Sequence, residues 1–281
     1  MLFSVIIPTC NRSHLLCNCL DLLFISRQEE MTIDYEVIIT DDSIGNEARS
    51  MIETRYKWAK WVEGPKRGPA ANRNNGVKFA KGEWLIFIDD DCLPDKNILN
   101  IYHNAVLANK NVTVFEGCIK ANRNQQSLIE ESPINESGGC LWSCNFMINK
   151  KLFLETLNGF DEKFPYATME DVDLHYRLKK LHVSCFFLKD ALVIHPWRLQ
   201  RKLISVTVKR FRSTLYFLNK HPERKKDLNS LYYIRAFYHN FFCQTIKKSI
   251  SYRFSGFVPK IAHDLLHLYF AVYLFLYNRK Q

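Results

Sequence analysis

The 281-residue sequence lacks an apolar run long enough to cross a membrane. The apolar stretch from Leu268 to Tyr277 is well short of the roughly 18 residues that suggest a membrane span. We expect it to lie in an interface or to cover the domain. The start of the chain also lacks a basic segment followed by an apolar segment and a cleavage site. This predicts no signal peptide and a cytoplasmic location, or a peripheral one at the inner face of a membrane.

Paired cysteines are also missing. The nine cysteines are odd in number and irregularly spaced, so they predict neither a disulfide framework nor a zinc knuckle. We expect reduced thiols in the core of a cytosolic protein. The sequence has no internal repeat and no low-complexity linker. With 47% hydrophobic and 24% charged residues, it suits one globular domain, alone or with an appendage.

Acidic residues are scarce in the last part of the chain. Residues 1–196 hold 22 Lys and Arg against 26 Asp and Glu, a net charge of −4, whereas residues 197–281 hold 17 against 3, a net charge of +14. The second range also contains 18 of the 38 aromatic residues. A segment that is both basic and aromatic suits an anionic membrane surface, and a contact in a homo-oligomer is the alternative.

The chemical signal that stands out is an apolar strand, 84–88, that ends in Asp89, Asp90 and Asp91. Three adjacent carboxylates repel one another unless a cation lies among them. Mg²⁺ and Mn²⁺ prefer oxygen ligands and are often shared with substrate phosphates, so the triplet indicates a metal site. A solvated acidic turn is the competing interpretation. Ligands of open α/β sheets bind beyond the carboxyl ends of strands, which favours the metal site.

Strands and helices alternate over the first 196 residues, which predicts an α/β fold with a mostly parallel sheet. From Leu203 the pattern is helical, with one stripe through Ile204, Val208, Phe211, Leu215 and Leu218 and a second through Leu231, Ile234, Tyr238 and Phe241. The strands expected in this part of the chain are 3–8, 35–40, 57–62, 84–88, 112–117, 142–148, 184–188 and 191–195. The helices expected between them are 13–24, 69–80, 94–108, one that starts at 149, and 170–181. A mobile loop is expected at 120–139.

The order of seven motifs resembles the family 2 glycosyltransferases. They are SVIIPTCNR (4–12), EVIITDDS (36–43), GPAANRNNG (68–76), GEWLIFIDDDCLPD (82–95), NGFDE (158–162), EDVDLHYRL (170–178) and ALVIHP (191–196). The resemblance implies a GT-A fold, which is a Rossmann-like sheet flanked by helices, over 1–196. A basic, aromatic and all-α region, 197–281, lies outside it.

The resemblance also implies a site for a nucleotide-sugar donor, with a UDP-sugar favoured, and for Mn²⁺ or Mg²⁺. Asp91 is expected to bind the metal, and His195 to complete its site. Asp89 is expected near the ribose or the metal's water, with Asp90 in support. The remaining donor contacts implied are Pro8, Thr9, Asn11, Arg12, Asp41 and Arg73, and Asp42 is an alternative to Asp41.

Asp171 is the expected general base, since an attacking hydroxyl must lose its proton to a positioned carboxylate. Its neighbours Glu170 and Asp173 are either part of the site or simply acids that favour a helix N-terminus. Single displacement by the activated hydroxyl inverts the anomeric configuration. The acceptor is expected to be a saccharide or a lipid-linked molecule, in surface polysaccharide or glycoconjugate synthesis.

Two positions depart from the family pattern. The chain continues after Asp42 with Ser-Ile-Gly-Asn, so the loop there is reshaped. His182 stands where the family favours Gly, and His is among the residues that tolerate a positive φ at a helix C-cap. Two other functions fit parts of the sequence: a nucleotidyltransferase that uses the same carboxylates, and a basic nucleic-acid-binding protein. The negative balance of 1–196 argues against nucleic acid.

Overall fold

The computed structural model describes residues 2–24 and 33–278. Residues 1, 25–32 and 279–281, which the predicted ranges 1–196 and 197–281 include, lie outside the described residues. The chain forms two compact units. The first consists of residues 1–122, 133–163 and 170–196, and the second of residues 123–132, 164–169 and 197–281. Two short segments from the first 196 residues, 123–132 and 164–169, thus belong to the second unit.

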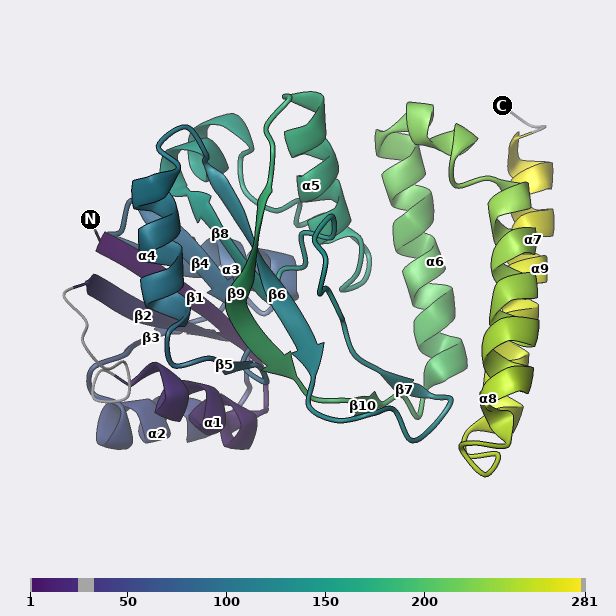
Figure 1. Cartoon of the computed structure of the whole chain (residues 1–281), viewed down its shortest axis with the longest axis horizontal. Coiled ribbons are helices and arrows are strands. Elements are labelled where there is room, and N and C mark those ends of the chain that lie inside the picture. Colours follow the sequence, from purple (N-terminus) through teal and green to yellow (C-terminus); the bar gives the residue numbers. More distant parts are fainter. Residues whose placement is uncertain (1, 25–32, 279–281) are drawn as a thin grey trace. The chain divides into compact units, whose positions relative to one another are not determined.

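The first unit is built on a mixed, mostly parallel sheet (Figure 1). In sheet order its strands are β3 (Lys60–Glu63), β2 (Asp34–Asp41), β1 (Leu2–Thr9), β4 (Trp84–Ile88), β8 (Asn145–Asn149), β6 (Val114–Ala121), β9 (Phe186–His195) and β5 (Leu93–Pro94). The first four are parallel, so their carboxyl ends meet at one edge. β8 runs antiparallel to β4 and β6.

Helices cover both faces of this sheet. One face packs on α1 (Ser13–Leu23), α2 (Glu47–Arg55) and α4 (Ile98–Ala108). The other packs on α3 (Pro69–Val77), the π-helix η2 (Leu152–Thr156) and α5 (Glu170–Lys180). Neighbouring residues of one strand serve opposite cores: Ile86 lies in the first and Phe87 in the second. This explains why the strand reads as a continuous apolar run.

The structure changes several predicted elements. The two strands expected at 184–188 and 191–195 are one strand, β9, with an irregularity in its pairing at Gly117 and Cys118 of β6. α2 is absent from the prediction, because its exposed, charged sequence has little apolar periodicity. His182 has a positive φ of 55°, a conformation that His tolerates, two residues after α5 ends. The 120–139 segment, expected to be a loop throughout, contains the short strand β7 (Glu130–Glu131).

The second unit is mainly helical, as predicted for the C-terminal region. Its elements are β10 (Arg198–Leu199), α6 (Leu203–Lys220), the 3₁₀-helix η3 (Pro222–Lys226), α7 (Ser230–Tyr238), the π-helix η4 (His239–Ile246), α8 (Lys247–Ser249) and α9 (Phe257–Asn278). α7 and α9 lie side by side (Figure 1). No helix in the described part of the chain has both the length and the hydropathy needed to span a membrane.

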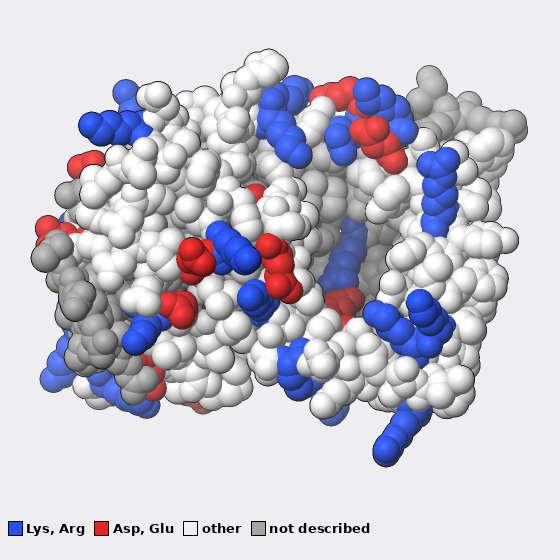
Figure 2. All heavy atoms as spheres, viewed as in Figure 1, with Lys and Arg blue, Asp and Glu red and all other residues white. Residues whose placement is uncertain are grey.

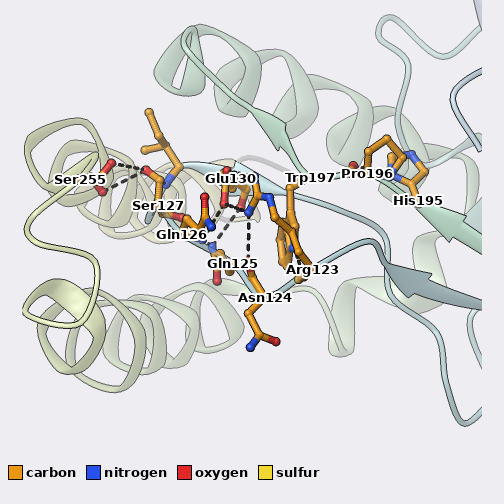
Figure 3. Close-up of polar contacts among 11 residues, drawn as sticks. Arg123, Asn124, Gln125, Gln126, Ser127, Glu130, His195, Pro196, Trp197 and Ser255 are labelled. Atoms are coloured by element: carbon orange, nitrogen blue, oxygen red, sulfur yellow. Dashed lines mark hydrogen bonds and ion pairs between the residues drawn. The ribbon is translucent and has the colours of Figure 1, made fainter. Parts of the chain in front are cut away.

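A short antiparallel ribbon of β7 and β10 completes this unit. Arg123 and Glu130 form an ion pair of 2.6 Å, and the Trp197 indole donates to the Arg123 carbonyl at 2.7 Å. Ser127 Oγ donates to the Ser255 carbonyl at 3.1 Å, which ties the ribbon to the turn before α9 (Figure 3). Among the described residues of the second unit, the ribbon holds the strands and the remaining regular elements are helices.

Burial in the second unit differs from the predicted stripes. In α6 Phe211 and Leu218 are buried as expected, but Ile204 is exposed and Leu203 and Val206 are buried in its place. All nine cysteines are free, and the prediction of core thiols holds for the four buried ones, Cys19, Cys92, Cys118 and Cys144. It is wrong for the three that are exposed, Cys10, Cys140 and Cys243.

Candidate active site

The acidic triplet follows β4 at the edge where the parallel strands end. Asp90 is fully buried and joins this loop to the end of β1. Its carboxylate accepts a hydrogen bond from Thr9 Oγ1 at 2.7 Å and pairs with Arg12 at 2.6 Å. Thr9 is the last residue of β1, and Arg12 immediately precedes α1. The loop after β1, which starts from Pro8 and Thr9, is thereby held against the acidic loop.

Asp91 lies beside His195, the last residue of β9, and both are buried. Asp91 Oδ1 is 3.5 Å from His195 Nε2. His195 Nδ1 lies 2.9 Å from the Pro196 carbonyl, which can only accept, so Nδ1 carries the proton and Nε2 offers its lone pair. Burial also lowers the pKa of His195, which favours the neutral imidazole.

Asp91, Cys92 and His195 together could hold a metal ion. Burial raises the pKa of the Cys92 thiol well above its usual value, so the sulfur stays protonated and is a poor ligand. This leaves one carboxylate and one imidazole. Such a set suits Mn²⁺ or Mg²⁺ when substrate phosphate oxygens supply further ligands.

Arg73 joins the acidic triplet to the start of α5. It lies in α3 and is only 4% exposed. One guanidinium nitrogen is 2.6 Å from Asp89 Oδ1, and another is 3.6 Å from Glu170 Oε1. Within the described residues, Arg73 Nε and Glu170 Oε2 are buried without a hydrogen-bond partner. Buried polar groups normally have partners, so these atoms indicate a place for a polar ligand.

Glu170 and Asp171 begin α5 and are both buried. Burial, followed by the neighbouring Asp171 charge, raises the pKa of Glu170 to about 7. Burial also raises the pKa of Asp171. The Arg73 charge and hydrogen bonds from backbone N–H groups, including those of Val172 and Ser143, act in the opposite direction and lower this pKa. A carboxylate whose pKa is raised is a stronger base than an exposed one, which suits proton abstraction.

Asp173 has a structural role. Its carboxylate accepts a hydrogen bond from Arg177 at 2.7 Å, one turn further along α5. Arg177 also donates to the Gly159 carbonyl at 2.9 Å, and Asn158 and Gly159 both have a positive φ. The pair therefore fixes the NGFDE turn. Glu170 and Asp173 therefore differ: Asp173 stabilises the fold, whereas the position of Glu170 fits a part of the site.

The end of β2 carries the predicted nucleoside contacts. Asp41 is buried and accepts hydrogen bonds from the Ser43 N–H at 2.9 Å and from the Trp61 indole at 3.2 Å. Asp42 accepts one from the Lys66 N–H at 2.8 Å. Asn11, with φ of 54°, donates its N–H to Ser43 Oγ at 2.7 Å. The loops after β1 and β2 are thus joined, and every predicted site residue belongs to the first unit.

Glu116 is absent from the residues predicted for the site; it lies in the middle of β6 and is 1% exposed. Its carboxylate accepts hydrogen bonds from Asn135 Nδ2 at 2.6 Å, the Gly139 N–H at 2.9 Å and the Cys140 N–H at 2.6 Å. These contacts hold the segment that leads to Ser143, whose N–H bonds to Asp171. The signal in the sequence was a single acid between the apolar residues of a strand, and it is the one acid of β6.

Comparison with known proteins identifies the family. The glycosyl transferase family 2 model matches residues 4–154, more than half of the chain, so the chain belongs to this family. The motif resemblance and the interpretation as a glycosyltransferase are thereby confirmed. The family favours sugar transfer over nucleotidyl transfer and over nucleic-acid binding.

Among similar sequences is GalNAc(5)-diNAcBac-PP-undecaprenol beta-1,3-glucosyltransferase from Campylobacter jejuni subsp. jejuni serotype O:2, 34% identical over 93 residues. The alignment covers 31% of this chain and only 29% of that protein. Two similar structures show the GT-A fold. S. aureus TarS 1-349 in complex with UDP has a TM-score of 0.55 and 21% identity, over 89% of this chain and 75% of that one. Mannosyltransferase PcManGT from Pyrobaculum calidifontis, in complex with GDP-Man and Mn²⁺, has a TM-score of 0.60 and 18% identity, over 98% and 87%.

Proposed function

We propose that the protein is an inverting, metal-dependent glycosyltransferase that moves a sugar from a nucleoside-diphosphate donor, with UDP favoured, to a hydroxyl of a saccharide or lipid-linked acceptor. The observation that carries this proposal is the cluster at the carboxyl edge of the sheet. There Asp91 lies 3.5 Å from His195, and Arg73 links Asp89 to Glu170, next to Asp171. Of the two similar solved structures, TarS is in complex with UDP, and PcManGT is in complex with GDP-Man and Mn²⁺. Both complexes support a nucleotide-sugar donor for this chain, and the second supports a divalent metal.

Asp91 and His195 are the residues that would hold Mn²⁺ or Mg²⁺. When bound, the metal would stabilise the negative charge that develops on the departing diphosphate. Arg73 adds a positive charge that Asp89 and Glu170 hold in place. The nucleoside would lie between the loops after β1 and β2, with Asn11 on one side and Asp41 on the other. Asp89 would approach the ribose.

Asp171 would take the proton of the attacking hydroxyl. It is buried at the start of α5, and its orientation is fixed by the N–H groups of Val172 and Ser143. Glu170, with a pKa of about 7, is partly protonated near neutral pH and could donate to a sugar oxygen. One base and one displacement invert the anomeric configuration. The C. jejuni relative is named for a lipid-linked substrate, which supports a lipid-linked acceptor and a peripheral location on the cytoplasmic side of a membrane.

Three variants test the assignment of roles with a transfer assay and a donor-binding assay. Asp171→Asn is expected to lower transfer by about 10²–10⁴-fold, the usual contribution of a general base, with donor affinity retained. Asp91→Ala is expected to lower both transfer and metal-dependent donor binding. Glu170→Gln mimics the protonated acid and is expected to keep transfer within about tenfold. Transfer that survives both Asp91→Ala and Asp171→Asn would contradict the proposal.

A further inference from the structure

An apolar stripe on the second unit faces solvent. It runs along one side of the continuous helical segment formed by α7, η4 and α8 and into the turn that follows, and its members are spaced by three or four residues. We call it the outer stripe. It consists of Leu231 (50% exposed), Ile234 (42%), Tyr238 (62%), Phe242 (50%), Ile246 (43%) and Ile250 (77%). Two of these, Phe242 and Ile246, lie in the π-helix, whose wider turn brings Phe242 into line in place of the predicted Phe241.

The outer stripe is separate from the face that this segment buries. Tyr233, Thr245 and Ser249 are its buried residues. The Tyr233 ring packs against the Phe270 ring of α9, with 5.7 Å between the two ring centroids. Thr245 Oγ1 donates a hydrogen bond to the buried carboxylate of Asp264, also in α9. The segment therefore has one side packed within the unit and another, apolar side left in water. A continuous exposed apolar surface of this kind marks an interaction site.

The charged residues of the segment that carries the outer stripe are all basic. Residues 228–263 contain five Lys and Arg and no Asp or Glu. Of these, Arg235 and Lys247 are exposed, and in sequence they directly follow Ile234 and Ile246 of the stripe. On the face shown in Figure 2, the surface over α7 is mostly uncharged, with separate basic side chains. Apolar side chains with basic neighbours are typical of a helix that lies in the interface of an anionic membrane.

We propose that the outer stripe docks on the surface of an anionic bilayer, with its apolar side chains at the boundary of the acyl chains and its Lys and Arg among the lipid phosphates. The segment would lie in the plane of the membrane, since no described helix could span it. Two more apolar side chains close to the end of this segment are exposed: Phe254 in the turn before α9, at 57%, and Val258 in the first turn of α9, at 76%. A second copy of this chain fits less well, because a two-fold contact would bring two acid-free basic segments together.

Vesicle flotation with the full chain tests this proposal. Wild-type protein is expected to float with phosphatidylcholine vesicles that contain 30% phosphatidylglycerol, and far less with phosphatidylcholine alone. Phe242→Ser/Ile246→Ser is expected to weaken binding at least about tenfold, since two large side chains are lost from the buried area. Each basic residue near an anionic surface contributes a factor of about five. Arg235→Gln/Lys247→Gln is therefore expected to weaken binding by about 25-fold.

The matched control is Leu107→Ser/Leu181→Ser, which removes two leucines of the first unit that are 58% and 47% exposed. It is expected to bind vesicles as wild type does. Thermal unfolding of each variant should match wild type, because the substituted side chains are largely exposed. Binding is measured without donor or acceptor, so it succeeds or fails independently of the proposed transferase activity.

Two results would overturn the proposal. The first is wild-type protein that stays unbound with anionic vesicles at low salt, or stripe variants that bind as tightly as wild type. The second is a concentration-dependent dimer, seen by analytical ultracentrifugation, that Phe242→Ser/Ile246→Ser dissociates while vesicle binding is unchanged. That result would assign the outer stripe to a contact between copies of the chain.

Discussion

Replacement of Glu116 by Gln tests whether one buried carboxylate positions the segment beside the general base. Gln has nearly the same volume, so packing of β6 is retained. Its oxygen can replace Oε1, which accepts from Asn135 and Cys140, but its amide nitrogen then faces the Gly139 N–H that Oε2 accepts. One charge-assisted hydrogen bond is lost, at about 1.5–3 kcal/mol. The other two become neutral and roughly half as strong.

The expected total loss is about 3 kcal/mol, and it falls on the segment from Asn135 to Ser143. Hydrogen exchange followed by mass spectrometry should show faster exchange of the Gly139 and Cys140 amides, by about 10²-fold if the segment opens locally. If unfolding is cooperative instead, the melting temperature should fall by at least about 5 °C. Since Ser143 bonds to Asp171, kcat should fall with little change in donor KM.

Glu136→Gln is the matched control, because Glu136 is exposed and lies 3.9 Å from Lys120. A surface pair of this kind contributes about 0–1 kcal/mol, so exchange and activity should match wild type. The reasoning is refuted if Glu116→Gln leaves both the Gly139 and Cys140 exchange rates and the melting temperature unchanged.

Two other predictions concern buried groups near the site. Gly117→Ala would place a Cβ 2.2 Å from Asn145 Nδ2. It should therefore lower the free energy of unfolding by about 3 kcal/mol, as measured by denaturant titration. Gly45→Ala is the control, because its Cβ would meet nothing within 4 Å, and it should have little effect. Equal stability of the two would refute the close packing described. Glu170 has a pKa of about 7, above its usual value of 4.5, because burial disfavours its charge. The protonated Glu170 therefore contributes to the stability of the fold below pH 4.5, and this contribution is lost as the pH rises through 7. Glu170→Gln should therefore gain stability relative to wild type between pH 5 and pH 8, and a constant difference would show that Glu170 is not perturbed.

The motif residues could be predicted from the sequence because they lie where strands end. Asp41 is the last residue of β2 and Asp91 follows β4, and parallel strands bring such ends to one edge of a sheet. Glu116 could not be predicted, since its partners lie about 20 residues further on and depend on how the 133–140 segment folds back. The helical period predicted the first part of the outer stripe, Leu231, Ile234 and Tyr238, but not its continuation through Phe242 to Ile250. The period alone could not say whether that side faces a core or solvent, because both need the same spacing.

Release of the nucleotide product tests the central claim most directly. Wild-type protein would be incubated with a panel of nucleotide sugars and candidate acceptors, with and without Mn²⁺ or Mg²⁺, and the nucleotide products separated by chromatography. The account predicts release of a nucleoside diphosphate, UDP first among them, that requires a divalent metal and is lost in Asp91→Ala. Release of inorganic diphosphate from a nucleoside triphosphate, or metal-independent transfer that Asp91→Ala retains, would contradict it.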